Sequence, residues 1–237
     1  MVSNNPLAII TGASTGIGKY ISLQLAENNY NVILISRNEQ NLKLVKSQIE
    51  EKGGNCTIIS ADIGTDSSIE KISSIIGDKN IDVLVNNAGV GIFNSIENIT
   101  ISDWDQQMNT NLRGSFLMTQ LSVESMIKRR SGKIIFMNSI AGMNPYPYSS
   151  AYVASKYGLR GFSSSLREEL REHNIKVISV HPGAIDTPFW NNIEGDFPRK
   201  DMLCAQDISN VVVNAILAKN DIVHEEIILR RTAGDIK

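Results

Sequence analysis

The stretch Thr11-Gly12-Ala13-Ser14-Thr15-Gly16-Ile17-Gly18 joins a short apolar run at residues 7–11 to an amphipathic segment at residues 16–28. Glycines in such a turn let the backbone bend sharply, approach a pyrophosphate and pack the helix closely on the strand. The amino end of that helix offers free N–H groups and a positive dipole end to phosphates. The stretch therefore predicts a nucleotide-binding turn, and a tight strand-to-helix turn without a ligand remains the alternative at this point.

Short β-branched runs alternate with longer amphipathic segments along the chain. Most runs are apolar on both faces, which is typical of parallel strands covered by helices on each side. The alternation predicts an α/β, doubly wound Rossmann fold with helices on both faces. The usual strand order of that fold then implies a seven-stranded parallel sheet of order 3-2-1-4-5-6-7. The expected strands are residues 7–11, 31–36, 56–61, 81–85, 133–138, 176–181 and 226–229. The expected helices are residues 16–28, 39–52, 66–76, 102–130, 150–173 and 205–219, of which 102–130 is long enough for two.

Composition and charge set the broad class. The 237 residues are 42% hydrophobic and 20% charged, which is ordinary for a globular protein with a sizeable core. No repeat, low-complexity tract or linker divides the chain, so we expect a single domain over residues 1–237. The net charge of -2 gives no electrostatic reason to expect nucleic acid or a membrane surface as a partner.

The N-terminus and the cysteines favour a cytoplasmic protein. The chain has no basic leader followed by a long apolar segment, and no stretch approaches the roughly 20 apolar residues that span a bilayer. Cys56 and Cys204 are too few for a disulfide framework, and neither has a metal-ligand spacing. We therefore expect no metal site.

The residues after the second expected strand indicate which dinucleotide the turn binds. A Rossmann fold that holds the ribose 2′-hydroxyl places an acidic residue there. This chain has Ser36-Arg37-Asn38 instead, so Arg37 can pair with a 2′-phosphate, Ser36 can add a hydroxyl contact, and nothing acidic stands in this stretch. NADP(H) is predicted over NAD(H); the alternative for Arg37 is a solvated surface cation.

Two further strand ends carry polar residues. Asp62 follows the third strand and is suited to hydrogen bonding near the adenine amino group. The fourth strand ends in Asn86-Asn87-Ala88-Gly89, whose amides and glycine can approach a cofactor closely. An asparagine-rich turn that ties neighbouring strands together explains this stretch equally well, and both readings can hold at once.

A tyrosine and a lysine stand near the start of the helix at residues 150–173. Tyr152 and Lys156 are four residues apart and so share a helix face. We expect the ammonium to lower the pKa of the phenol, which makes the tyrosine an acid or base for interconverting a carbonyl and an alcohol. Ser139, at the end of the fifth strand, can hold the substrate oxygen. Asn111 is polar among apolar neighbours and can extend a proton path through water or simply satisfy the core.

These motifs occur together in the order and spacing of a known family. They are Thr11-Gly12-x3-Gly16-Ile17-Gly18, Asn86-Asn87-Ala88-Gly89, Asn111, Ser139, Tyr152-x3-Lys156 and Pro182-Gly183. The chain resembles the short, single-domain branch of the short-chain dehydrogenase/reductase family, with similarity to carbonyl reductases and 3-oxoacyl-carrier-protein reductases. The resemblance runs from residue 6 to about residue 187 and resumes weakly to the C-terminus.

The resemblance implies a role for each matching residue. Tyr152 is the general acid or base, Lys156 lowers its pKa and holds the nicotinamide ribose, Ser139 polarises the substrate oxygen, and Asn111 supports a water linked to Lys156. Backbone groups near Ile185 and the Thr187 hydroxyl contact the nicotinamide carboxamide. The implied cofactor contacts are Gly12, Ser14, Thr15, Gly16, Ile17, Gly18, Ser36, Arg37, Asp62, Ile63, Asn87, Ala88, Gly89, Tyr152, Lys156, Pro182, Gly183, Ile185 and Thr187.

The substrate pocket is expected around residues 182–200, the least regular stretch of the chain. Phe189 and Trp190 fall there, as a lid or pocket wall over an apolar substrate or as anchors of the loop. Met143 and Tyr146 follow Ser139 and are further candidates for the wall. His181 ends a strand and can border the site or serve the core.

The sequence thus predicts reduction of a small-molecule ketone or aldehyde by NADPH, with a homodimer or homotetramer as the assembly. Residues 226–235 lack the glycine-rich terminal strand of many carrier-protein ketoreductases, which argues against an acyl-thioester substrate and the usual tetramer. Two alternatives stay open: an NADPH-binding redox sensor without turnover, and an alcohol dehydrogenase working in the oxidative direction. The identity of the substrate is not readable from the sequence.

Overall fold

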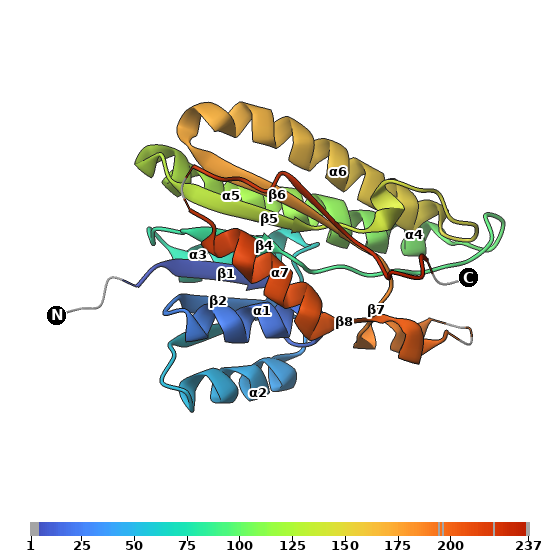
Figure 1. Ribbon diagram of the computed structural model, residues 1–237, viewed down its shortest axis with the longest axis horizontal. Helices are drawn as coiled ribbons and strands as arrows, with labels where there is room; N and C mark the ends of the chain where they lie inside the picture. Colours follow the sequence, from blue (N-terminus) through green and yellow to red (C-terminus); the bar gives the residue numbers. More distant parts are fainter. Residues whose placement is uncertain (1–4, 194, 196, 220, 236–237) are drawn as a thin grey trace.

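The computed structural model describes residues 5–193, 195, 197–219 and 221–235, and its main feature is one parallel sheet (Figure 1). The strand order is β3-β2-β1-β4-β5-β6-β9, so the predicted order is confirmed with β9 as its seventh strand. Each neighbouring pair in this sheet is parallel. The strands are β1 (Leu7–Thr11), β2 (Asn31–Ser36), β3 (Cys56–Ser60), β4 (Val83–Asn86), β5 (Gly132–Met137), β6 (Ile175–Pro182) and β9 (Glu226–Leu229).

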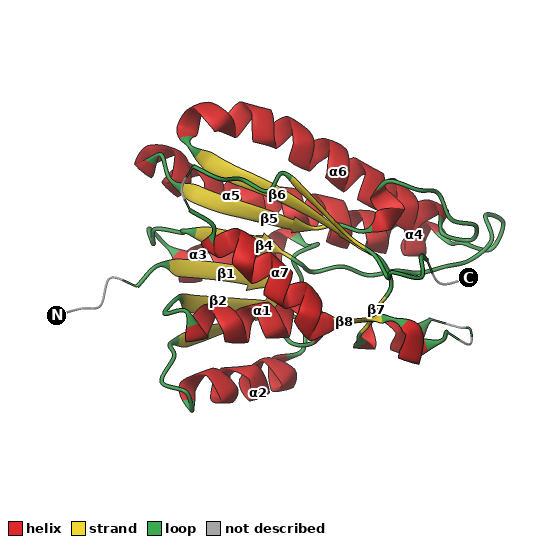
Figure 2. Cartoon of the chain, viewed as in Figure 1, coloured by secondary structure: helices red, strands yellow, loops and turns green. Residues whose placement is uncertain are grey.

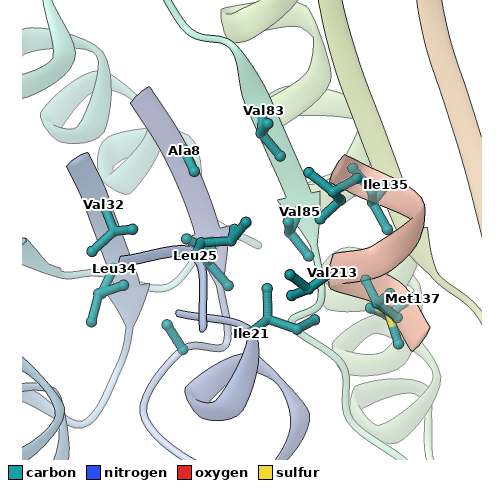
Figure 3. Close-up of a cluster of buried hydrophobic side chains, with 14 of the residues drawn as sticks. Ala8, Ile21, Leu25, Val32, Leu34, Val83, Val85, Ile135, Met137 and Val213 are labelled. Carbon is teal, nitrogen blue, oxygen red and sulfur yellow. The ribbon is translucent and has the colours of Figure 1, made fainter. Parts of the chain in front are cut away.

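Helices cover both faces of the sheet (Figure 2). One layer packs Ile21, Leu25 and Val213 against Ala8 and Val85, as Figure 3 shows. The other layer packs on alternate strand residues such as Ile9. Because both faces of the sheet are covered, the side chains on both sides of each strand are mostly apolar, which explains the continuous apolar runs in the sequence. The first layer is α1 (Gly16–Glu27), α2 (Glu39–Glu50) and α7 (Ala205–Leu217). The second contains α3 (Asp66–Ile76), α5 (Gly114–Arg129) and α6 (Ser150–Leu170).

The expected helix at residues 102–130 runs without a break in the chain of helical turns, but its middle is π-helical. The helix α4 (Ile101–Gln107) begins at a capping box of Thr100 and Asp103. A π-helical segment, Met108–Arg113, then leads directly into α5. Such segments insert one residue per turn and are frequent at functional sites.

The irregular stretch after β6 contains short ordered pieces. Within it β7 (Ile185–Asp186) pairs in parallel with β8 (Leu203–Cys204), outside the main sheet. Arg199 closes the stretch by bonding the Asp186 carboxylate at 2.5 Å and the Thr187 carbonyl at 2.8 Å. Positions 194 and 196 of the predicted substrate loop lie outside the described residues. Among the residues described, no helix combines the length and apolar character needed to cross a membrane.

The glycine turn packs against the end of β4, where the sheet order reverses direction. The Thr11 hydroxyl accepts from the backbone nitrogens of Asn87 and Ala88, both at 3.0 Å. The Asn87 amide donates in return to the Thr11 and Gly12 carbonyls at 2.9 and 3.1 Å. Gly12 has a φ of +63°, which side chains rarely adopt. These hydrogen bonds join the ends of β1 and β4, as the sequence predicted for the asparagine-rich turn.

Gly18 has no room for a side chain, which leads to a stability prediction. A Cβ there would overlap the Asn87 amide nitrogen and lie 2.5 Å from the Gly12 carbonyl oxygen. We expect Gly18→Ala to lower the free energy of unfolding by about 1–3 kcal/mol through overpacking. Gly161→Ala is the matched control, because a Cβ at that helical position meets nothing within 4 Å. That variant should gain about 0.5–1 kcal/mol in urea unfolding, and equal stability of Gly18→Ala and the wild type would contradict the packing argument.

Candidate active site

A cavity of about 1390 Å³ follows the carboxyl edge of the sheet. It brings together the glycine turn, the ends of β2 to β6 and the loop after β6, which is where doubly wound sheets bind ligands. The predicted residues that line it are Gly12, Ser14, Thr15, Gly16, Ile17, Ser36, Arg37, Asp62, Ile63, Asn87, Ala88, Gly89, Ser139, Tyr146, Tyr152, Lys156, Pro182, Gly183, Ile185, Thr187, Phe189 and Trp190.

Three predicted residues are not among those that line the cavity. Gly18 lies beneath the turn, against Asn87. Asn111 is fully buried behind the wall. Met143 instead uses its backbone carbonyl to accept a 2.7 Å hydrogen bond from the Tyr157 hydroxyl. The expectation that Met143 forms part of the pocket wall therefore finds no support in the geometry.

The turn and the end of β2 form a polar pocket at one end of the cavity. The Ser14 and Ser36 hydroxyls lie 2.8 Å apart, and the Arg37 side chain beside them is 59% exposed. Two hydroxyl groups and a free guanidinium suit a phosphate group. The glycine turn at the start of α1 supplies the complementary site for a pyrophosphate. The cavity thus fits a 2′-phosphorylated dinucleotide.

In the folded protein the carboxylate of Asp62 lies near Arg37, although the two residues are 25 positions apart in the sequence. Asp62 Oδ2 lies 3.9 Å from the guanidinium, because β2 and β3 run in parallel and end side by side. The other carboxylate oxygen accepts from the Gly64 backbone nitrogen at 2.9 Å. An exposed pair at this distance is weak, so Arg37 stays available to an anion.

Tyr152, Ser139 and Lys156 converge on the middle of the cavity. Tyr152 and Lys156 lie in α6, one turn apart, and the Lys156 ammonium is 5.7 Å from the centre of the tyrosine ring. Lys156 donates to the Met137 carbonyl at 3.0 Å. Ser139 begins the short helix Ile140–Gly142, and its hydroxyl accepts from the Ala141 backbone nitrogen at 3.0 Å. The serine proton can then point at the Tyr152 oxygen or at a ligand.

Burial controls the titration of these groups. Burial raises the pKa of Tyr152 to about 12, and a hydrogen bond with Ser139 partly opposes that rise. Burial lowers the pKa of Lys156 to about 8. The tyrosine pKa therefore moves opposite to the direction expected from the sequence, because desolvation penalises both charged forms and the ammonium bonds Met137. The phenol is protonated at neutral pH.

Asn111 lies in the π-helical segment and ties two parts of the site together. Its side chain accepts from the Val90 backbone nitrogen at 2.8 Å and donates to the Val90 carbonyl at 2.9 Å. It also donates to the Ser155 hydroxyl at 3.0 Å, so both amide protons are used. The side chain thus satisfies the core and joins the loop after β4 to α6. The predicted water link to Lys156 stays a prediction.

Aromatic side chains form one wall of the cavity around Tyr152. The Phe93 ring meets the Tyr152 ring edge-on at 5.4 Å, and the Phe189 ring lies 6.0 Å away. Trp190 packs 5.5 Å from Phe189 and donates to the Ile185 carbonyl at 2.9 Å. A Cβ at Gly91 would overlap the Phe189 ring, so this glycine makes room for it. The loop aromatics therefore both anchor the loop and line the cavity.

The sequence reasoning missed Phe93 and the C-terminal segment, and it did not single out Phe197 within the expected 182–200 pocket stretch. Phe93 follows β4, and both phenylalanines line the cavity. Arg231 and Asp235 also line it, and Asp235 accepts from the Tyr146 hydroxyl at 3.0 Å. The Gly91-Ile92-Phe93 stretch directly after a strand end was the available signal for Phe93. No local pattern marks the tail.

Comparisons with known proteins agree with this geometry. The model of the short chain dehydrogenase family matches residues 6–196. Sepiapterin reductase of Chlorobaculum tepidum is 36% identical, over 98% of each chain. A 3-oxoacyl-acyl-carrier-protein reductase of Staphylococcus epidermidis is 35% identical, over 85% of this chain and 83% of the relative.

Two solved structures share this fold and are more than 25% identical in sequence. A metagenomic short-chain oxidoreductase in complex with NADP has a TM-score of 0.84 and 31% identity, covering 96% of this chain and 97% of that one. An alcohol dehydrogenase from Thermococcus sibiricus complexed with 5-hydroxy-NADP has a TM-score of 0.89 and 26% identity, covering 98% and 99%. This chain belongs to the short-chain dehydrogenase/reductase family. It is an NAD(P)-dependent oxidoreductase.

The pocket formed by Ser14, Ser36 and Arg37 is expected to favour NADPH over NADH. We expect Arg37→Asp to raise the Kd for NADPH about 100-fold, because a bidentate cation on the 2′-phosphate is replaced by a repelling carboxylate. The Kd for NADH should change less than about threefold, and it serves as the internal control. Fluorescence titration of both dinucleotides measures the ratio. An undiminished preference for NADPH would show that Arg37 does not read the phosphate.

Proposed function

We propose that this chain reduces a ketone or aldehyde with NADPH, with Tyr152 as the proton donor. The observation that carries the proposal is the convergence of Tyr152, Ser139 and Lys156 on the cavity that also contains the phosphate-binding turn. The NADP complexes of the two structural neighbours support the cofactor. When bound, NADPH supplies a hydride to the substrate carbon.

The protein's own residues handle the oxygen. The Ser139 hydroxyl, already held by Ala141, donates a hydrogen bond to the carbonyl oxygen and fixes its direction. The Tyr152 hydroxyl transfers its proton to that oxygen as negative charge develops there. The tyrosinate left behind lies near the Lys156 ammonium, whose pKa of about 8 suits the return of a proton. Lys156 thereby returns a proton to Tyr152 at neutral pH.

The cofactor is held by residues at both ends of the cavity. With NADPH bound, the turn at the start of α1 would take the pyrophosphate, and Ser14, Ser36 and Arg37 would take the 2′-phosphate. Lys156 would hold the nicotinamide ribose, and the backbone near Ile185 with the Thr187 hydroxyl would hold the carboxamide. Preference for a 2′-phosphate favours reduction over alcohol oxidation as the physiological direction.

The aromatic wall favours a flat, unsaturated substrate over a flexible acyl chain. Rings from two separate segments face Tyr152, and aromatic pairs favour stacked or edge-on contacts with another ring. Polar side chains of Tyr146, Arg231 and Asp235 also line the cavity. Sepiapterin reductase, at 36% identity, is named for a pterin ketone. We therefore propose a ketone on a planar, polar heterocycle as the substrate class.

Replacing the proton donor tests the reaction. We expect Tyr152→Phe to reduce kcat about 10²–10⁴-fold while the Kd for NADPH is retained, because only the proton transfer is removed. Tyr157→Phe is the matched control: it lies in the same helix, and its hydroxyl bonds the Met143 carbonyl. NADPH absorbance is followed with sepiapterin, diketones and quinones. An unchanged kcat for Tyr152→Phe would refute the role, and a wild type that binds NADPH without consuming it would favour the redox sensor.

Removing the aromatic wall tests the substrate class. We expect Phe93→Ala and Trp190→Ala each to raise the KM for sepiapterin about tenfold through lost ring contacts. The KM for a small aliphatic diketone should change much less. Trp104→Ala is the control, because Trp104 is part-exposed and does not line the cavity. Equal effects on both substrates would argue against recognition of a flat ring.

A further inference from the structure

A buried histidine lies directly behind the predicted catalytic serine. His181 is the penultimate residue of β6 and is 0% exposed. Its Nδ1 lies 3.3 Å from the Ser139 carbonyl oxygen, which also accepts from the Gly142 backbone nitrogen at 2.9 Å. His181 does not line the cavity, so it contacts the site through the backbone of Ser139.

The other side of the imidazole faces a carboxylate. His181 Nε2 lies 3.6 Å from Glu226 Oε1, across the pairing of β6 with β9. The Arg160 guanidinium holds that carboxylate with two bonds, at 2.9 and 3.1 Å. Arg160 is in α6, one turn beyond Lys156. At 3.6 Å the carboxylate makes no hydrogen bond with Nε2, which has no hydrogen-bond partner among the described residues, so the one hydrogen-bond contact of the ring is with Ser139.

The partners of the ring determine its protonation pattern. The Ser139 carbonyl can only accept, so the contact at Nδ1 requires a proton on that nitrogen. Burial lowers the pKa of His181, and the Ser139 carbonyl and Glu226 act against that effect. Arg160 and Lys156 in α6 are the cations that face it. Arg160 also keeps the pKa of Glu226 below its usual value, so this partner stays a carboxylate.

We propose that His181 is a positioning residue, which holds the Ser139 backbone through Nδ1–H. The contact joins the segment that carries the serine to the buried end of β6. The consequence rests on the proposed function, because it concerns how well Ser139 is aimed at the substrate oxygen. Misplacement of such a group by a fraction of an ångström is enough to slow a reaction.

Nitrogen NMR of the histidine ring tests the geometry without any turnover. Long-range ¹H–¹⁵N spectra report which ring nitrogens carry protons, and the loss of one set of signals in His181→Asn assigns this residue. We expect Nδ1 to be protonated in the wild type, as the Nδ1–H tautomer or the imidazolium. A neutral ring with its proton on Nε2 alone would overturn the proposal, because Nδ1 could then donate nothing to Ser139. This result stands whether or not the proposed carbonyl reduction is correct.

Kinetics test the consequence for catalysis. We expect His181→Leu to lower kcat about tenfold with the Kd for NADPH unchanged, since only the aim of Ser139 is affected. In His181→Asn the amide nitrogen replaces Nδ1, and kcat should return to within about threefold of the wild type. Glu225→Gln is the matched control, because this neighbouring carboxylate pairs with Arg171 and does not contact His181. Its kcat should match the wild type.

The outcomes separate the two proposals. If His181→Leu retains full kcat, or if folded His181→Asn is no better than folded His181→Leu, the positioning role is refuted. Thermal melting of each variant shows whether the compared proteins are folded. If the wild type reduces no carbonyl compound, the proposed function fails, and the NMR measurement still decides whether the histidine holds the Ser139 carbonyl.

Discussion

The contact of Asn87 with the glycine turn is the constraint on which the rest of the site depends. One amide group bonds the carbonyls of Thr11 and Gly12, while the Thr11 hydroxyl receives two backbone nitrogens from the segment after β4. These bonds fix the distance between β1 and β4, where the strand order reverses and the crevice opens. Gly18 must then stay a glycine, because α1 begins directly above the same amide.

Desolvation is the second physical factor, and it acts on both Tyr152 and Lys156. A buried phenol keeps its proton and a buried ammonium gives its proton up more easily. This combination suits proton donation to a developing alkoxide better than proton removal from an alcohol. Lys156 donates to the Met137 carbonyl at 3.0 Å, with its ammonium 5.7 Å from the centre of the Tyr152 ring.

The substrate side of the cavity is built from segments that are distant in the chain. Phe93 follows β4, Phe189 and Trp190 follow β7, and Asp235 comes from the C-terminal tail. Their convergence produces a wall that is aromatic near Tyr152 and also includes the polar Asp235. A family whose members share the turn and the catalytic residues can therefore differ in substrate through this wall alone.

The sequence by itself determined the fold class and the residues of the turn and the Tyr152–Lys156 pair. These follow from local patterns: continuous apolar runs, glycine spacing and the four-residue repeat of a helix face. The strand order was expected from the fold class, not from any local pattern. Only the tertiary structure decided that Asp62 lies beside Arg37, that Phe93 faces Phe189, and that His181 Nδ1 lies 3.3 Å from the Ser139 carbonyl oxygen. It also reversed the expected pKa shift of Tyr152, because burial depends on the whole fold and leaves no mark in the nearby sequence.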